Sequence, residues 1–506
     1  MSATIMTKAI QICGTGSGVG KSVICAGLCR LFYRSGYKVA PFKAQNMALN
    51  SYVTFDGGEI GRAQAEQAYA AGIAPNVHMN PVLLKPSADR RAQVIVQGVS
   101  IGSMSAVEYA RRKKSLLKKV YQSYENLAQN YRIIVIEGAG SPAEINLKQH
   151  DFVNMKMAEY ADAKVILVGD IDKGGVFASI IGTLELLDEN ERDRIKGFII
   201  NKFRGDKRLL QGGLRFLEKK TGKKVLAVIP YYNNIKIGEE DSVSLDDNII
   251  HNTQYTIQKN RINIAVIKLP HISNFTDFDA LKNEPMVNLR YVKTPQELDG
   301  SDVIILPGTK NTIGDLKWLQ LSGLAEKILT TRNPQLTTIL IGICGGFQML
   351  GKTINDPYRI ESSRAQIDGL GLFDMETRLS KTKKTSQVKG RDLIWDTNVS
   401  GYEIHHGETI IKKHMPAFKV IRRNNARVSL KDGCISPDNR IWGTYIHGIF
   451  DNKDFRRRFL INAAKGKNCL HRDLVFSDFN REKEFDKLAD LVKKNIDLGY
   501  LYGLLK

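Results

Sequence analysis

The second half of this chain is organised by one stretch, Thr337-Thr338-Ile339-Leu340-Ile341-Gly342-Ile343-Cys344-Gly345-Gly346-Phe347-Gln348. An apolar, β-branched run ends at a cysteine flanked by glycines, and a segment able to form a helix follows. This pattern predicts a strand, a sharp turn and a helix with Cys344 at the turn, which is the layout of a nucleophile elbow. The N-terminus of that helix favours the thiolate. A buried, unreactive cysteine at a strand end is the alternative.

Two further segments could complete a site around this cysteine. A thiol nucleophile needs a base, which is usually distant in sequence and close in space, and His447 follows a short apolar run downstream. Residues 302–311 form a predicted strand that runs into a glycine turn. Backbone N–H groups of such a turn and of the elbow can stabilise an oxyanion, so Gly308 and Gly345 are the candidate oxyanion-hole positions.

These three segments, in this order, resemble the class I glutamine amidotransferase domain. The elbow motif G-x-C-x-G-x-Q is matched by Gly342, Cys344, Gly346 and Gln348. The resemblance implies that Cys344 and His447 are the catalytic pair. In most such domains a glutamate two residues after the histidine orients it, but Ile449 stands there in this chain. The group that orients His447 is left open, with Asp451 and Glu403 as candidates.

Composition sets broad limits on the function. The 506 residues, 42% of them hydrophobic, suggest two to four domains with sizeable cores. No apolar run reaches the ~18 residues of a membrane span, and the first residues do not resemble a signal peptide. The six cysteines show no paired spacing, which argues against a zinc site or a disulfide framework. We therefore expect a cytoplasmic protein with no membrane partner.

The chain is strongly basic, with a net charge of +21. Such a charge can indicate nucleic-acid binding, but no nucleic-acid motif is present and we expect no such partner. The longest basic cluster, residues 111–114 continued by 118–119, lies in a helix-like stretch and is interpreted as a solvated helix face. A smaller share of the charge could steer anionic substrates such as ATP and polycarboxylates.

A phosphate-binding loop stands near the N-terminus, as Gly14-Thr15-Gly16-Ser17-Gly18-Val19-Gly20-Lys21-Ser22, between a short apolar strand and a predicted helix. Backbone N–H groups of such a loop cradle phosphates, its lysine reaches the β and γ oxygens, and its serine can ligate Mg²⁺. The predicted nucleotide contacts in the loop are Gly14, Thr15, Gly18, Gly20, Lys21 and Ser22.

Further strands follow the loop and alternate with helical segments, which predicts a doubly wound parallel sheet with ligands at the carboxyl ends of its strands. Glu137 ends one buried strand and could hold Mg²⁺ with Ser22. Asp170 ends another and could contact the metal or the substrate. The Gly-Thr start of the loop and the sequence Glu-Gly-Ala-Gly from Glu137 resemble dethiobiotin synthetase. That resemblance implies that Asn201 and Lys202 contact the adenine.

Three polar segments, residues 43–51, 56–64 and 80–87, are too rich in amides, glycine and lysine for plain connections. Together with residues 169–177 they closely resemble the cobyric acid synthase family, in which the glutamate after the catalytic histidine is commonly missing. The resemblance spans roughly residues 8–450. The candidate substrate-binding residues on these segments and on the strand ends are Lys43, Asn46, Asn50, Asp56, Lys85 and Asp170.

The family resemblance implies an α/β protein with two doubly wound domains. We expect an ATP-dependent amidoligase domain at 1–240, a linker at 241–260, a glutamine amidotransferase domain at 261–450 and a helical C-terminal extension at 451–506. The implied reaction uses ATP, Mg²⁺ and glutamine. It amidates the b, d, e and g carboxylates of a corrinoid substrate, adenosylcobyrinic acid a,c-diamide, through acyl phosphates. A homo-oligomer is possible.

Three local expectations complete the picture. Residues 270–278 could touch the partner domain, residues 380–385 are expected to form an exposed loop, and His405 is either structural or near the glutaminase pocket. Rival functions are the sister amidase that makes the a,c-diamide, a regulatory or partitioning ATPase, and a corrinoid-binding module without catalysis. The segments with Asn46 and Asp56 argue against the first. Gly16, where partitioning ATPases carry an extra lysine, argues against the second, and the intact phosphate loop against the third.

Overall fold

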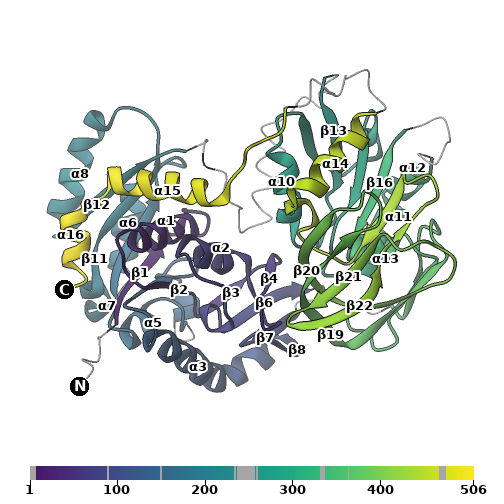
Figure 1. The fold of residues 1–506 in the computed structure, drawn as a ribbon. Coiled ribbons are helices and arrows are strands. Elements are labelled where there is room, and N and C mark those ends of the chain that lie inside the picture. Colours follow the sequence, from purple (N-terminus) through teal and green to yellow (C-terminus); the bar gives the residue numbers. More distant parts are fainter. Residues whose placement is uncertain are drawn as a thin grey trace.

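The computed structural model describes residues 7–87, 91–148, 151–232, 235, 257, 260–330, 337–362, 364–465 and 475–506. The chain forms two α/β domains, each built on a six-stranded sheet (Figure 1). The predicted linker at 241–260 lies outside the described residues, except for residues 257 and 260.

The first domain has an entirely parallel sheet in the order β12-β11-β10-β1-β9-β2. Its strands are rich in valine and isoleucine and buried on both faces, as parallel strands require. The strands are β1 (Lys8–Gly14), β2 (Val39–Phe42), β9 (Ile133–Glu137), β10 (Lys164–Asp170), β11 (Ile195–Phe203) and β12 (Lys224–Pro230). This confirms the predicted doubly wound sheet, with one apolar core on each face.

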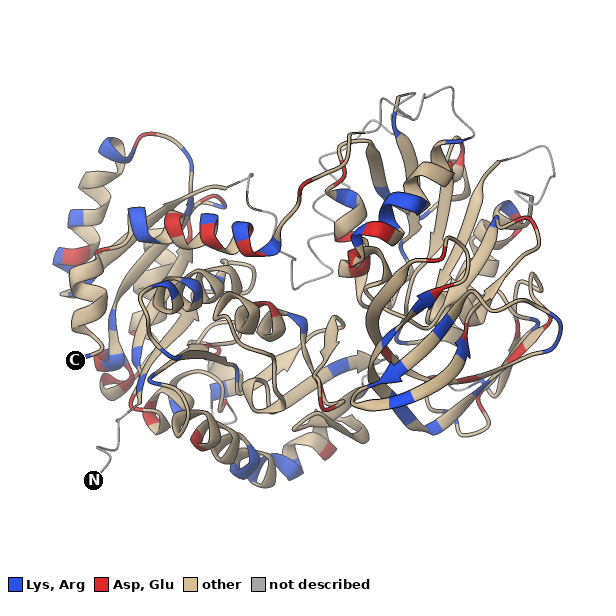
Figure 2. Cartoon of the chain, in the orientation of Figure 1, with Lys and Arg blue, Asp and Glu red and all other residues tan. Residues whose placement is uncertain are grey.

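Helices cover both faces of this sheet (Figure 1). They are α1 (Lys21–Arg34), α2 (Arg62–Ala70), α3 (Ala106–Ala128), α4 (Ile145–Lys148), α5 (Met155–Tyr160), α6 (Val176–Glu185), α7 (Glu189–Arg194) and α8 (Lys207–Thr221), with a short 3₁₀ turn at Val77–Met79. Helix α3 begins with a capping box formed by Ser105 and Glu108. Its basic cluster is solvent-exposed except for the half-buried Lys113, while Leu116 and Val120 are buried, which confirms the predicted solvated face (Figure 2).

Small strands extend the first domain toward the second (Figure 1). Four of them form the sheet β3 (Gln45–Met47), β6 (Val82–Ser87), β7 (Arg91–Val96) and β8 (Val99–Ser105), and a hairpin joins β4 (Ser51–Val53) to β5 (Glu59–Gly61). Strands β3, β5 and β6 lie in the polar segments that sequence analysis singles out, β4 begins at the end of one, and β7 and β8 follow them. These segments thus lie at the boundary between the domains, where β4 contacts both long strands of the second domain.

The second domain has the sheet β14-β13-β15-β16-β24-β23, parallel except for β23. Its strands are β13 (Ile262–Ile267), β14 (Val287–Val292), β15 (Val303–Leu306), β16 (Ile339–Ile343), β23 (Cys434–Ile435) and β24 (Ile441–Thr444). Its helices are α10 (Asp279–Lys282), α11 (Thr312–Leu321), α12 (Leu324–Thr330), α13 (Gly345–Met349) and α14 (Lys453–Ala464), with 3₁₀ turns η2 (Phe275–Phe278), η3 (Pro295–Leu298) and η4 (Ile449–Asp451).

The second domain also contains a second sheet, which is mostly antiparallel. It contains β17 (Thr353–Asn355), β18 (Gln366–Asp368), β19 (Met375–Asp392), β20 (Asn398–Ile411), β21 (Phe418–Arg423) and β22 (Ala426–Asp432). The expectation of an exposed loop at 380–385 is wrong, because these residues belong to β19. Their pairing with β20 is irregular between Leu379 and Lys384, and Lys383 forms an ion pair with the buried Glu59 of the first domain.

The C-terminal segment is divided between the two domains. Helix α14 packs Phe455 and Phe459 against Trp442 in the second domain. Helices α15 (Arg481–Asn495) and α16 (Leu498–Gly503) return to the first domain, where α15 lies beside α1 (Figure 1). There the apolar face of α15, which includes Phe485 and Leu488, joins the core. The predicted single extension is therefore two pieces. No described helix is long and apolar enough to cross a membrane.

Candidate active sites

The phosphate-binding loop has the expected backbone geometry. It joins the end of β1 to α1, with Gly18 and Gly20 at φ of 71° and 99°, a region that favours glycine. The Lys21 ammonium donates to the carbonyls of Gly16 at 2.8 Å and Gly140 at 3.1 Å. A Cβ at Gly14 would lie 2.9 Å from the Lys21 nitrogen. Glycine is therefore needed there for the lysine to fold over the loop.

Glu137 lies beside this loop at the carboxyl end of β9, and it is almost fully buried. Its Oε1 accepts hydrogen bonds from the Ser22 hydroxyl and the Lys43 ammonium, both at 2.8 Å. Its Oε2 accepts from the Gln67 and Gln64 amides at 2.5 and 3.3 Å. A serine hydroxyl next to one carboxylate is the kind of oxygen set that holds Mg²⁺ together with nucleotide phosphates. The residues present thus fit the predicted metal.

The end of β11 closes the loop from the other side. The Asn201 amide donates to the Val19 carbonyl at 2.9 Å, and the Lys202 ammonium donates to the Gly18 carbonyl at 2.8 Å. Lys202 also pairs with Asp170 at 2.7 Å. The Asn201 Oδ1 is buried without a hydrogen-bond partner, which is unusual in a folded protein. A donor on a bound base could satisfy it, and the adenine contact stays a prediction.

The six predicted substrate-binding residues do not form one surface. Lys43 and Asp170 lie at the phosphate loop, where Lys43 pairs with Glu137 and Asp170 pairs with Lys202. Asn46 donates a hydrogen bond to Gln64 at 2.9 Å. The other three lie at the domain boundary. Asn50 contacts the second domain, Lys85 is bound to Glu59, and Asp56 lines a cavity of about 620 Å³ between the domains.

The elbow around Cys344 has the predicted form, with β16 ending directly before the cysteine and α13 starting directly after it. Cys344 has φ 51° and ψ −107°, a conformation rarely adopted by residues other than glycine. A Cβ at Gly346 would lie 2.0 Å from the Leu306 carbonyl oxygen, and one at Gly342 would lie 2.7 Å from the Gly346 carbonyl oxygen. The tight turn therefore needs the glycines on both sides of the cysteine.

The base of this site is oriented by a residue that sequence analysis missed. His447 Nδ1 lies 2.6 Å from the Asp277 Oδ2, and the other Asp277 oxygen accepts the Gly448 N–H at 3.0 Å. Burial lowers the pKa of His447, but the Asp277 carboxylate and the Cys344 sulfur raise it to about 10. His447 is thus held as an imidazolium between the Asp277 carboxylate and the Cys344 sulfur.

Neither sequence-based candidate for the orienting group contacts His447. Glu403 accepts a hydrogen bond from Arg423 at 2.9 Å, and burial raises the pKa of Asp451 beside Arg481 and Arg62. Asp277 lies 170 positions before His447. It belongs to residues 270–278, which sequence analysis noted only as a possible domain contact. Nothing in the sequence around Asp277, between Phe275 and Phe278, indicates that it orients a histidine.

The candidate oxyanion-hole residues lie next to the elbow. A Cβ at Gly308 would lie 3.0 Å from His447 Cε1, and one at Gly345 would lie 3.2 Å from the backbone nitrogen of Thr309. The turn after β15 is fixed by backbone hydrogen bonds to residues 271 and 273, at 3.0 and 2.9 Å. The geometry therefore brings both predicted glycines to the nucleophile and base, and their part in binding an oxyanion stays a prediction.

A small pocket of about 30 Å³ lies at Cys344, takes residues from both domains and shares Lys310 and Glu361 with the 620 Å³ cavity. Besides the cysteine and His447 it is lined by Lys85, Ser273, Asn274, Thr309, Lys310, Thr312, Gly345, Gln348, Glu361, Lys383, Ile404, His405 and His406. His405 therefore lies at the pocket, where its ring stacks on Tyr445 with centroids 3.8 Å apart. Burial lowers the pKa of His405 to about 3, so it is neutral.

The segment that holds Asp277 is clamped by the first domain. The Ser51 N–H donates to Asn274 Oδ1 at 3.0 Å, and the Phe275 N–H donates to Asn50 Oδ1 at 3.1 Å. The Tyr402 hydroxyl, whose ring stacks on His447, donates to the Ser51 carbonyl at 3.2 Å. The orientation of the base therefore depends on contacts with the other domain, as expected for residues 270–278.

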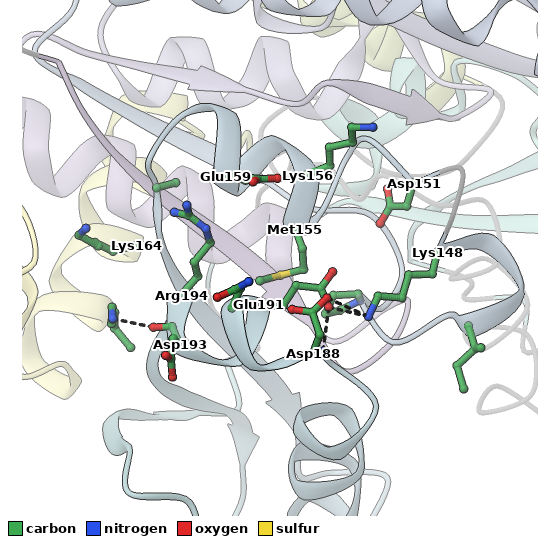
Figure 3. Close-up of a pocket in the computed structure, with 15 residues that line it drawn as sticks. Lys148, Asp151, Met155, Lys156, Glu159, Lys164, Asp188, Glu191, Asp193 and Arg194 are labelled. Carbon is green, nitrogen blue, oxygen red and sulfur yellow. Dashed lines mark hydrogen bonds and ion pairs between the residues drawn. The ribbon is translucent and has the colours of Figure 1, made fainter.

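A hollow of about 870 Å³ on the first domain shares no lining residue with either site (Figure 3). Lys148 points at Asp188 and Glu191 and pairs with them at 3.7 and 2.6 Å. These three charges satisfy one another, and Lys164 and Arg194 of the lining pair with Asp162.

Comparisons with known proteins identify both domains and the family of the chain. Residues 10–245 match a "CobQ/CobB/MinD/ParA nucleotide binding domain", and residues 263–455 match a "CobB/CobQ-like glutamine amidotransferase domain". The chain is 49% identical to a cobyric acid synthase of Thermoanaerobacter sp. (strain X514), over 99% of each chain. It is 47% identical to a cobyric acid synthase of Clostridium tetani (strain Massachusetts / E88), over 98% of each chain. The chain therefore belongs to the cobyric acid synthase family.

Proposed function

We propose that this chain amidates the b, d, e and g carboxylates of adenosylcobyrinic acid a,c-diamide, with ATP, Mg²⁺ and one glutamine for each amide. The observation that carries this is the pairing of two sites in one chain. A phosphate loop with an acid at the metal position stands in one domain, and a Cys–His–Asp site whose pocket includes Lys85 of that domain stands in the other. Both cosubstrates are cytoplasmic metabolites, so we place the reaction in the cytoplasm.

The second domain supplies ammonia. The Cys344 thiolate attacks the side-chain amide carbon of glutamine, and the oxyanion that forms accepts hydrogen bonds from N–H groups beside Gly308 and Gly345. His447 gives its proton to the leaving ammonia, which leaves a thioester on Cys344. The neutral His447, held by Asp277, then takes a proton from water, which attacks the thioester and releases glutamate.

The first domain activates the acceptor. A corrinoid carboxylate oxygen attacks the γ-phosphorus of ATP, which gives an acyl phosphate and ADP. Lys21 and the loop N–H groups stabilise the charge on the transferred group. Ser22 and Glu137 would hold Mg²⁺, which would supply positive charge to the phosphates. Ammonia then attacks the acyl carbon and phosphate leaves, so that the amide forms and one proton is released.

The test is an amidation assay read by mass spectrometry, with ATP, Mg²⁺, the corrinoid and either glutamine or ammonia. The wild type should add four amides from either nitrogen source. Cys344→Ala should add them only from ammonia, and Lys21→Met from neither. No mass change of the a,c-diamide with the wild type would refute the assignment and favour the sister amidase, which the matching assay with cobyrinic acid would detect.

A further inference from the structure

The Cys344 pocket contains two opposite charges that attract each other without forming a direct ion pair. Lys310 follows the Gly308 turn, Glu361 follows β17, and both line the pocket. Within the described part of the chain, neither forms an ion pair within 4.0 Å. Both backbones are fixed, because the Lys310 N–H donates to the His271 carbonyl at 3.0 Å and the Glu361 N–H donates to Asp356 at 3.0 Å.

The other charged groups of the pocket are already satisfied. Lys85 and Lys383 both bind Glu59, at 3.1 and 2.5 Å. Burial lowers the pKa of His405 and His406 to about 3, so both are neutral. His447 is paired with Asp277. Among the titratable groups that line this pocket, Lys310 and Glu361 are therefore the ones available to a ligand, aside from the nucleophile itself.

Two buried acceptors in the same pocket also lack partners. Gln348 Oε1 and His405 Nε2 make no hydrogen bond. The His405 Nδ1 lies 2.7 Å from the Gly407 carbonyl and donates to it, so its Nε2 is an acceptor. Buried acceptors are normally satisfied, which indicates a ligand that brings N–H groups.

An empty pocket penalises both charges. Burial lowers the pKa of Lys310 and raises that of Glu361, and it outweighs both their mutual attraction and the hydrogen bond that Glu361 Oε2 accepts from the Thr312 N–H at 2.8 Å. A buried charge is tolerated when it is paired. A ligand with one carboxylate and one ammonium group would therefore stabilise both residues in their charged forms.

We propose that Lys310 binds the α-carboxylate of glutamine and Glu361 binds its α-ammonium group, while the side-chain amide reaches Cys344 beside the free acceptors of Gln348 and His405. This inference rests on the proposed glutaminase function and assigns its substrate specificity. Glutamine would be recognised at both ends by the two charges that the pocket leaves open.

The experiment measures glutamate release and amidation separately in Lys310→Met and Glu361→Gln. The KM for glutamine should rise roughly 10- to 100-fold in each, as expected for a lost buried charge contact. Amidation from ammonia should stay within about twofold of wild type. Lys381→Met is the matched control, because Lys381 lines the neighbouring 620 Å³ cavity but not this pocket, and its KM for glutamine should not change.

Two glutamine analogues separate recognition from a structural effect. Glutaramate lacks the α-amino group, and 4-aminobutanamide lacks the α-carboxylate. Glu361→Gln should lose its preference for glutamine over glutaramate and keep its preference over 4-aminobutanamide. Lys310→Met should show the reverse.

Unchanged glutamine KM, or equal losses with glutamine and ammonia, would overturn the assignment. Absence of wild-type amidation from either nitrogen source, with glutamate release intact, would instead count against the proposed corrinoid reaction and leave this inference standing.

Discussion

The two sites of this chain are built in different ways. The phosphate loop is made by consecutive residues, and its lysine and its acid are bound within one domain. The Cys344 site combines distant segments, a strained nucleophile, and contacts from the other domain through Asn50 and Lys85. The first site is completed within one domain, whereas the second is complete only when the domains meet. Variants of the second should therefore separate glutamine use from ammonia use, and variants of the first should not.

The largest effects are expected for variants of Cys344 and Lys21, which touch the reacting groups. Cys344→Ala removes the nucleophile, so glutamate release should fall by roughly 10³-fold or more. Lys21→Met should abolish amidation from both nitrogen sources to a similar extent, because the stabilisation of the transferred phosphoryl group is lost. Coupled assays of glutamate, ADP and amide measure all three products.

Glutamate release by the Lys21→Met variant tests whether the Cys344 site needs only the contact between the domains or also the bound nucleotide. If the Cys344 site depends only on domain contact, it should still hydrolyse glutamine. Complete loss of glutamate release would show that the nucleotide itself completes the second site.

Asp277→Asn should have the next largest effect. It removes the carboxylate that orients His447, so kcat for glutamate release should drop roughly 10²- to 10⁴-fold. The Asp277 charge raises the pKa of His447, so the imidazolium persists at neutral pH and is lost as the pH rises toward the pKa of about 10. Without that charge the pKa falls, and the alkaline limb of kcat/KM should move to lower pH.

Asp451→Asn is the control for this prediction. Asp451 is a candidate for the same role from sequence, and it follows His447 closely. Its removal should leave the alkaline limb in place. A shift with Asp451→Asn and none with Asp277→Asn would reverse the assignment.

Asn50→Ala tests the clamp between the domains. Losing one hydrogen bond to the Phe275 N–H should loosen the segment that holds Asp277, and glutamate release should fall by a few-fold, in line with about 1 kcal/mol for such a bond. Ammonia-dependent amidation should change less. Equal loss with both nitrogen sources would favour the substrate-binding role that sequence analysis gives to Asn50.

These contrasts follow what the sequence could and could not predict. The parallel sheets and both glycine turns were predictable, because apolar strands and Gly-rich turns are local patterns. Asp277 and the return of α15 were not, because each depends on a contact far away in the chain. Strand β19 was mistaken for a loop at 380–385, since its lysines look solvent-exposed until Glu59 of the other domain is placed beside Lys383.

The smallest effect on catalysis is expected for variants of α15, the helix with which the chain returns to the first domain. Helix α15 packs closely on α1, where a Cβ at Gly27 would lie 3.2 Å from Leu488 Cγ, and α1 begins at Lys21 of the phosphate loop. Leu488→Ala should lower the free energy of unfolding by about 2–5 kcal/mol and leave the KM for glutamine unchanged. Leu209→Ala, at a side chain 87% exposed on α8, should have almost no effect. Thermal unfolding of both variants, followed with and without ATP, checks this. A destabilised first domain with an intact Cys344 site would show that the last helices support the phosphate loop, although they follow the other domain in the chain.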